Sequence, residues 1–438
     1  MMKHLLCGAA ERVITPRLGL HIPGYFKIRI ADAVKTDLKT HALVLDDGKT
    51  QLAIIHIDII DFQASLAKRI RKRLQEAIGI DPKNVMIAAT HTHTGQPSNY
   101  SGLAGSRQDR ESMSFLIDMT VEAVLEAYGK RVPVSTKCAF GKETNLSFNR
   151  NYHMTDGTIV TNPGKRRPFE VVGPISPIDH TVGVIRFDDA NGTPVAQLVN
   201  FACHPDTVGG TAYCADYPGE LCRIQQERFG KDFVTVYLNG ASGNVNHINA
   251  EWFKQPNFAL DKAHHYIKMG ETLSKKVFEL HEHMEPMKEI SLDTLSKTYR
   301  TERRQPTDAD FEWSEKILQS EDAVLEDQAY ARELLALHKR PVRYANVEIQ
   351  AFRIGDCAIA TLPCEAYADI ALNIRKNAPF EKMMISSLTN GTVGYVVTEP
   401  AFSAGVYESR LSKYNSFLPP QAADEMANCA LALLKKLC

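Results

Sequence analysis

The segment 41–60, HALVLDDGKTQLAIIHIDII, is the sequence feature that most constrains the fold. It consists of two apolar runs joined by Asp-Asp-Gly, a pattern typical of a β-hairpin. The next segment, 64–78, has apolar residues at helical spacing and is followed by a glycine and a proline that end a helix. The apolar run NVMIAAT then predicts a strand that leads to His91. Together these elements predict a β-α-β unit, so we expect an α/β fold.

Strand patterns that end in polar residues recur along the chain. A second hairpin, VGVIRFDDANGTPVAQLVNFACHP, ends at His204, and the strand DFVTVYL runs into the glycine-rich turn NGASGNVN. The runs CAIATLPCE and KMMISSLTNGTVGY end at Glu365 and Tyr395. Ligands of open α/β sheets bind outside the carboxyl ends of the strands. We therefore expect one domain over residues 1–438, a large mixed sheet flanked by helices, with these polar residues meeting at the strand ends.

A charged, helix-prone segment lies between about 300 and 340. Its sequence, DADFEWSEKILQSEDAVLEDQAYARELLALHK, predicts a helical insertion at the periphery of the domain. Two interpretations stay open: the helices present an ordinary solvated face, or they cover the crevice at the strand ends.

The charge balance narrows the class of partner. The chain has 438 residues, with 51 Lys and Arg against 52 Asp and Glu, and a formal net charge of -1. This balance does not favour nucleic acid, so we expect a small-molecule substrate. We expect neither a transmembrane segment nor a signal peptide, and hence a cytoplasmic protein, although a secreted protein that has lost its leader would look the same. The oligomeric state stays open.

The pair of histidines in IAATHTHTG is the first candidate site. His91 and His93 are two residues apart, so both face one side if the backbone stays extended. Neutral imidazole is a good zinc ligand, but a polar strand end is an equally ordinary interpretation. Taken singly, His204, Glu365 and Tyr395 also have structural interpretations as a strand end, a helix cap and a packed aromatic residue. The residues alone therefore leave the question open.

Six segments in order resemble the neutral/alkaline non-lysosomal ceramidase family. They span about residues 8 to 408 and read AATHTHTG, SFNRN, NFACHP followed by ADYPG, NGASGNVN, LPCE, and NGTVGYVVTEPAFSAGVYE. The resemblance implies a zinc-dependent amidase that cleaves an N-acyl bond. It further implies that zinc is bound by His91, His204, Glu365 and Tyr395.

The resemblance also implies which residues surround the scissile amide. His93, Arg150 and Tyr407 match positions that contact the substrate or stabilise developing negative charge, and zinc would polarise the carbonyl and activate water. The family carries Gly-Asp-Val-Ser-Pro-Asn, whose Ser has been proposed as a nucleophile, whereas this chain has GNVNHI with Asn246 at that place. An amide side chain cannot form an acyl-enzyme. We therefore expect direct attack by a zinc-activated water, with Asn246 orienting the substrate or the water.

Two other functions stay open on sequence grounds. One is a zinc hydrolase of an ester or of a sugar-derived substrate, because Asn, Arg and Tyr around zinc do not specify amide chemistry. The other is a catalytically silent homologue that binds metal or a ligand. The retention of all four presumed zinc ligands favours an enzyme.

Overall fold

The predicted β-α-β unit is present in the computed structural model, which describes residues 5–98, 107–164, 167–255, 257–287 and 290–438. Strands β3 (Lys39–Asp46) and β4 (Gln51–Ile57) form the antiparallel hairpin, and helix α1 (Ala64–Ile78) leads to β5 (Val85–Ala89), parallel to β4. Gly79 ends α1 with a φ of 72°, a conformation that glycine adopts without steric cost.

The large sheet has nine strands. Its order is β14-β12-β11-β6-β1-β3-β4-β5, with β16 paired to β6. Pairing is parallel at β4–β5 and β12–β14 and antiparallel elsewhere, so the predicted mixed sheet is confirmed. The remaining strands of this sheet are β1 (Leu5–Val13), β6 (Val132–Lys142), β11 (Thr181–Asp189), β12 (Pro194–Phe201), β14 (Val234–Asn239) and β16 (Glu285–Pro286).

This sheet folds back on itself at β6. The first residues of β6 pair with β1, and the residues from Val134 onward pair with β11. As a result β14 lies against β3 and β4, where the Tyr237 backbone N–H donates to His56 Nδ1 at 2.8 Å and His41 Nδ1 donates to the Thr235 carbonyl at 2.7 Å. The Asn239 side chain also donates to the Thr90 carbonyl at 3.4 Å. The ends of β5 and β14 therefore meet although they lie at opposite ends of the strand order.

A second sheet of four strands continues beside β14. Its order is β17 (Leu292–Glu302), β18 (Tyr344–Ile354), β19 (Cys357–Thr361) and β21 (Lys382–Ser386). The Asn200 side chain exchanges two hydrogen bonds with the Ile385 backbone, at 2.8 and 3.1 Å, and Ser387 N–H donates to the Asn239 carbonyl at 2.9 Å. A single large sheet was predicted from the sequence, because local patterns do not specify which strands pair.

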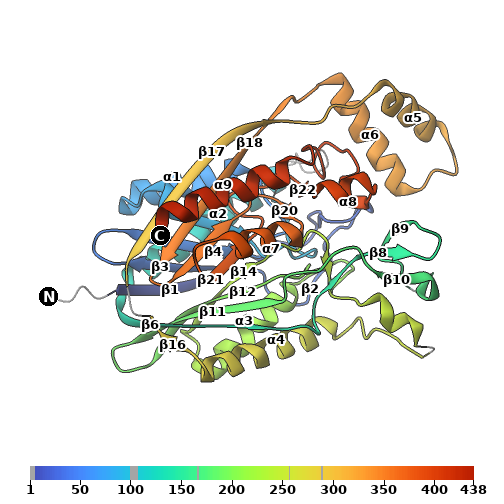
Figure 1. Ribbon diagram of the computed structural model, residues 1–438. Helices are drawn as coiled ribbons and strands as arrows, with labels where there is room; N and C mark the ends of the chain where they lie inside the picture. The colour runs from blue at the N-terminus through green and yellow to red at the C-terminus, as the bar shows by residue number, and fades with distance from the viewer. Residues whose placement is uncertain (1–4, 99–106, 165–166, 256, 288–289) are drawn as a thin grey trace.

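Helices cover the outer faces of both sheets (Figure 1). Helices α1 and α2 (Arg107–Gly129) pack on β3, β4 and β5. Helices α3 (Asp216–Phe229) and α4 (His265–Glu282) pack on β11, β12 and β14. Helices α7 (Ala368–Asn377) and α9 (Ala422–Leu437) pack on the second sheet. Fully buried side chains from both sheets, including Phe187, Leu238, Phe352 and Ile359, form the core between them. Burial of such side chains stabilises the fold by about 1.5–3 kcal/mol each.

Short strands and helical turns lie within the loops at the strand ends. The strands among them are β2 (Ala33–Val34), β7 (Phe148–Asn149), β8 (Asn151–Met154), β9 (Ile159–Thr161), β10 (Val171–Pro174), β13 (Ala212–Tyr213), β15 (Val245–Asn246), β20 (Glu365–Ala366) and β22 (Tyr395–Val396). The helices among them are α8 (Glu399–Ser403) and the 3₁₀ turns η1 (Pro82–Asn84), η2 (Pro168–Glu170), η3 (Ala250–Lys254) and η4 (Tyr407–Ser409).

The charged segment forms two helices, α5 (Asp308–Gln319) and α6 (Leu325–Lys339), which project beyond the ends of β17 and β18 (Figure 1). Thr307 and Asp310 form a capping box at the start of α5. Arg410 ties α6 to the rest of the domain through an ion pair with Asp327 at 2.6 Å. Over the described residues, no helix has the length and hydropathy needed to cross a membrane.

Candidate active site

His91 reaches the site through a turn. The condition for strand alternation, an extended backbone through Thr92, is not met, because β5 ends at Ala89 and His91 has a φ of 74°. Non-glycine residues rarely adopt this conformation, and it costs of order 1–3 kcal/mol. The turn is held by the hydroxyls of Thr92 and Thr94, which donate to the Cys214 carbonyl at 2.7 and 3.0 Å. Tertiary contacts, and not strand alternation, therefore aim the two histidines.

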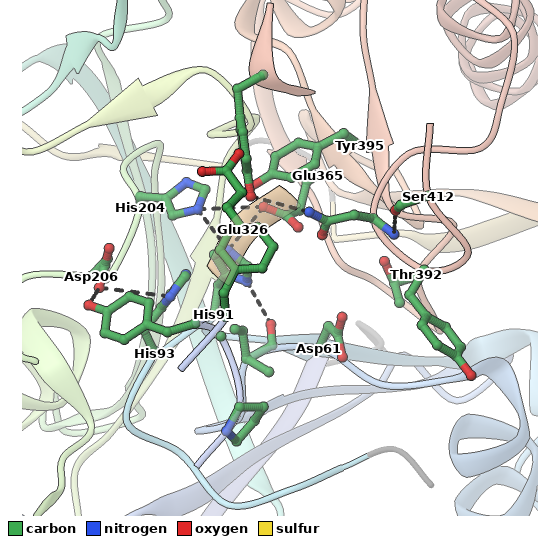
Figure 2. Close-up of a pocket in the computed structure, with 18 of the residues that line it drawn as sticks. Asp61, His91, His93, His204, Asp206, Glu326, Glu365, Thr392, Tyr395 and Ser412 are labelled. Carbon is green, nitrogen blue, oxygen red and sulfur yellow. Dashed lines mark hydrogen bonds and ion pairs between the residues drawn. The ribbon is translucent and has the colours of Figure 1, made fainter. Parts of the chain in front are cut away.

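Three predicted zinc ligands converge within 3.5 Å of one another (Figure 2). His91 Nε2 lies 3.0 Å from His204 Nε2 and 3.2 Å from Glu365 Oε2, and His204 Nε2 lies 3.5 Å from the same carboxylate oxygen. They follow the ends of three different strands, β5, β12 and β19. His93 also offers a ring nitrogen, within 4.8 Å of those of His91 and His204.

The donor atoms fit a metal ion. The Nδ1 atoms of His91 and His204 donate to the carbonyls of Ile60 and Ser242 at 2.7 and 2.9 Å, so in each neutral ring Nε2 carries the lone pair. Glu365 Oε2 is buried and has no hydrogen-bond partner among the described residues. Three electron pairs thus face one point, and backbone carbonyls orient the rings as in known metal sites. A cation at this point would satisfy all three atoms.

Electrostatics favour the ligating protonation states of His204 and Glu365. Burial holds the pKa of His204 well below its usual range, which favours the neutral ring. Burial alone would raise the pKa of Glu365, but neighbouring His91 outweighs it and lowers that pKa, so the carboxylate is ionised. The pKa of His91 is raised: burial lowers it, and the Glu365 charge outweighs burial.

Tyr395 lies beside Glu365 because β20 and β22 pair in parallel with these two residues in register (Figure 2). Its side chain is buried, and burial holds the pKa of the phenol well above its ordinary value. The Arg150 guanidinium lies 5.4 Å from the centre of the Tyr395 ring and 5.9 Å from that of Tyr407. The fourth predicted ligand is therefore at the same site.

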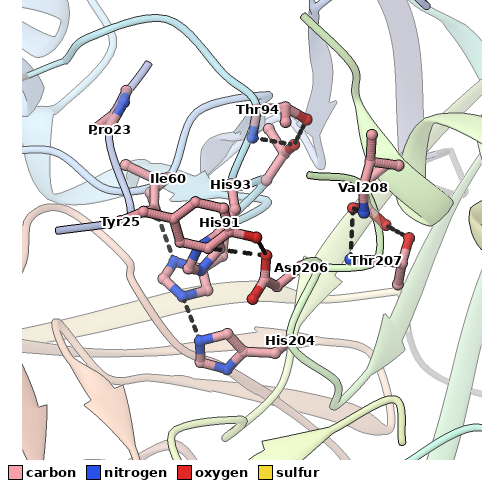
Figure 3. Close-up of polar contacts among 12 residues, drawn as sticks. Pro23, Tyr25, Ile60, His91, His93, Thr94, His204, Asp206, Thr207 and Val208 are labelled. Atoms are coloured by element: carbon pink, nitrogen blue, oxygen red, sulfur yellow. Dashed lines mark hydrogen bonds and ion pairs between the residues drawn. The ribbon is translucent and has the colours of Figure 1, made fainter. Parts of the chain in front are cut away.

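His93 is held by a network that the sequence analysis missed (Figure 3). Its Nδ1 lies 3.8 Å from Asp206 Oδ1, to which the Tyr25 hydroxyl also donates a hydrogen bond. Arg29 donates to the His93 carbonyl at 2.6 Å and lies over the Tyr25 ring. Neither ring nitrogen of the buried His93 has a hydrogen-bond partner among the described residues. The position of Asp206 in CHPD, two residues after His204, was the one available signal.

Arg150 is held in place by Glu408, a residue that was not predicted from the sequence. Arg150 Nε donates to Glu408 Oε1 at 2.6 Å, and Glu408 also accepts from the Tyr367 hydroxyl at 2.7 Å and from the Asn151 side chain at 3.2 Å. Both charged side chains are buried. One guanidinium nitrogen, Nη2, is buried and has no hydrogen-bond partner among the described residues. Glu408 directly follows Tyr407 in the motif GVYE, which was a signal for it.

A cavity of about 1010 Å³ joins these residues. It is lined by His91, His93, Arg150, His204, Glu365, Tyr395 and Tyr407. Tyr407 begins η4, and its hydroxyl accepts from Asn415 at 3.3 Å. Glu326, Tyr330 and Glu333 of α6 form part of the wall, so this helix contributes to the pocket. Asn246 lines a neighbouring cavity, where its side chain donates to Asn162 at 2.8 Å.

A second buried group, His41, His56 and Cys222, is a weaker metal candidate. His56 Nδ1 accepts a hydrogen bond from the Tyr237 backbone, so the proton of the neutral ring is on Nε2. Burial holds the pKa of Cys222 well above its usual value, whereas metals bind the thiolate. This group therefore lacks the free donor atoms of the first.

Comparison with known proteins agrees with the motifs. Residues 6–214 match the model of the neutral/alkaline non-lysosomal ceramidase N-terminal family. The chain is 26% identical over 205 residues to a neutral ceramidase of Mycobacterium tuberculosis, covering 42% of this chain and 32% of that protein. It is 26% identical over 133 residues to neutral ceramidase B of Dictyostelium discoideum, covering 29% of this chain and 17% of that one. The matched regions thus span a third or less of these relatives.

The fold also matches a solved structure. The crystal structure of neutral ceramidase from Pseudomonas aeruginosa superposes with a TM-score of 0.78 at 17% identity, covering 99% of this chain and 74% of that one. A structure described as ceramidase complexed with C2 gives a TM-score of 0.75 at 16% identity, covering 99% and 75%. The resemblance inferred from the motifs is confirmed: residues 6–214 match the family model of the neutral/alkaline non-lysosomal ceramidase N-terminal region, and the fold matches that of a neutral ceramidase.

Proposed function

We propose that this chain is a zinc-dependent hydrolase that cleaves an amide (N-acyl) bond in a small molecule. The observation that carries the proposal is the convergence of three buried donor atoms, from His91, His204 and Glu365, within 3.5 Å. Zinc prefers such nitrogen and oxygen ligands, and Tyr395 is the proposed fourth. When bound, zinc supplies a Lewis acid for the carbonyl oxygen and lowers the pKa of a bound water to about 7.

The surrounding residues would then orient the substrate and stabilise charge. The ring N–H of His93 and Nη2 of Arg150 are proposed to donate hydrogen bonds to the substrate carbonyl oxygen as negative charge develops on it. Tyr407, held by Asn415, is proposed to complete this wall of the cavity. Since Asn246 lies in the neighbouring cavity, its proposed role is orientation of the substrate from that side.

The polar cavity wall also supports a second candidate, hydrolysis of an ester or sugar-derived substrate. Glu326 and Glu333 line the same cavity as the proposed metal ligands, together with Ser412 and Asn415. Hydroxyl-rich or amine-bearing groups would find hydrogen-bond partners there. The formal net charge of -1 supports a small molecule over nucleic acid as the partner.

The test compares an N-acyl amine, the matching ester and a glycoside as substrates of the zinc-loaded full chain. We expect amide hydrolysis, and a loss of about 100-fold in kcat/KM for Tyr395→Phe. Tyr344→Phe is the matched control, because Tyr344 is an exposed tyrosine on β18 that lines neither cavity. Activity toward esters or glycosides alone would overturn the amidase assignment. No activity with any of the three would favour a silent homologue.

A further inference from the structure

A second cavity of about 390 Å³ adjoins the catalytic one. The two cavities share three lining residues, Tyr25, Asn162 and Asp206. Asp206 is separated from the proposed metal ligands only by His93, whose Nδ1 lies 3.8 Å from Asp206 Oδ1. The second cavity is thus a side compartment of the same site.

Two hydrogen bonds form the boundary between the compartments. The Tyr25 hydroxyl donates to Asp206, as Figure 3 shows, and the Asn246 side chain donates to Asn162 at 2.8 Å. His247 Nε2 fixes the boundary further by a hydrogen bond to the Asp206 carbonyl at 3.1 Å. A substrate that spans both compartments would place polar atoms, such as those of an amide, at this boundary.

Beyond the boundary the lining is mainly apolar. It includes Tyr152, Ile248, Ala250, Phe253 and Leu260. Phe253 and Trp252 pack against Phe258 with ring centroids 5.2 and 5.5 Å apart, which holds the turn η3 that carries this wall. The described lining has charge only at the shared Asp206 and at Lys262, an exposed residue.

The catalytic cavity has more charged residues in its lining, which includes Asp61, Glu326, Glu333 and Glu365. An N-acyl compound has the same two parts, an apolar acyl group and a polar amine portion. We propose that the second cavity binds the acyl group, and that this group is a medium chain of about eight carbons or a single aromatic ring. For comparison, an apolar cavity of about 150 Å³ holds benzene. This inference rests on the proposed amidase function.

Acyl-chain specificity tests the assignment. The zinc-loaded full chain is assayed with acetyl, octanoyl and dodecanoyl amides of one chromogenic amine. We expect kcat/KM for the octanoyl amide to exceed that for the acetyl amide by at least about 10-fold, because each added methylene contributes binding energy in an apolar pocket. Leu260→Trp, which fills the second cavity, should remove this preference, and Phe253→Ala, which enlarges it, should favour dodecanoyl. Val172→Trp, at an exposed residue outside both cavities, should leave the preference unchanged.

The outcomes separate this inference from the proposed function. If wild type, Leu260→Trp and Phe253→Ala hydrolyse amides with the same acyl preference, the acyl assignment is overturned. The proposed amidase function would still hold. If no amide is hydrolysed, the amidase proposal fails. Calorimetric measurement of octanoate binding then decides whether the second cavity is an apolar acyl site. Octanoate binding that Leu260→Trp weakens about 10-fold would support an apolar acyl site. No octanoate binding by the wild type would overturn it.

Discussion

The buried ion pair between Arg150 and Glu408 yields a quantitative prediction. Glu408 is 1% exposed and accepts hydrogen bonds from Arg150, Tyr367 and Asn151. Replacing it by leucine leaves the Arg150 charge buried and unpaired, which costs about 3–5 kcal/mol. Replacing both residues removes the unpaired charge, so Arg150→Met/Glu408→Leu should be more stable than Glu408→Leu alone by about 1.5 kcal/mol or more.

Urea unfolding of wild type, both single variants and the double variant measures this coupling. The unfolding midpoints are compared among variants whose free energy of unfolding has the same slope against urea concentration. A changed slope indicates that the unfolded or the native state itself has changed. Two results would refute the reasoning: a cost below about 1 kcal/mol for Glu408→Leu, or a double variant whose loss equals the sum of the two single losses. Either would mean that Glu408 does not compensate the Arg150 charge.

Two further predictions concern Asp58 and the loop against His93. Burial raises the pKa of Asp58 to about 7, above its unfolded value of about 3.9, so the folded state binds more protons between these values and stability falls as pH rises through this window. Asp58→Asn should therefore gain stability relative to wild type between pH 5 and 8 in urea unfolding; a constant difference would contradict this. At Gly24, with a φ of 103°, a Cβ would lie 2.9 Å from His93 Nδ1, so Gly24→Ala should lose about 1–3 kcal/mol of stability and also lose activity. Gly48→Ala, at a φ of 80° with open space around it, should lose stability only, and equal activity of the two variants would count against a role for this loop.

Local features of the fold were predictable from sequence. The α1 segment 64–78 was predicted from periodicity and its glycine stop, and both hairpins were predicted from their turn residues. The division into two sheets was not predictable. It depends on pairings such as β19 with β21 and on the return of β14 to β4, which arise from tertiary packing.

The candidate site shows the same limit. Three of the proposed ligands were candidates because each follows a strand end, and the resemblance to the ceramidase family implied their role as zinc ligands. Their approach depends on the turn at His91, which no spacing rule predicts. Glu408 escaped prediction because its partner Arg150 lies 258 residues away in sequence. Asp206 escaped because its tie to Tyr25 joins residues 181 positions apart. The pairing itself leaves no local pattern, although the motifs CHPD and GVYE place Asp206 and Glu408 next to predicted site residues.

Zinc content tests the central claim most directly. The purified full chain, loaded with zinc and freed of excess metal, is measured for zinc by mass spectrometry alongside His91→Ala and His93→Ala. The account predicts about one equivalent in the wild type and in His93→Ala, and a near-complete loss in His91→Ala, because His91 is a ligand and His93 binds substrate. Less than about half an equivalent in the wild type, or equal loss in both variants, would contradict the proposed ligand set.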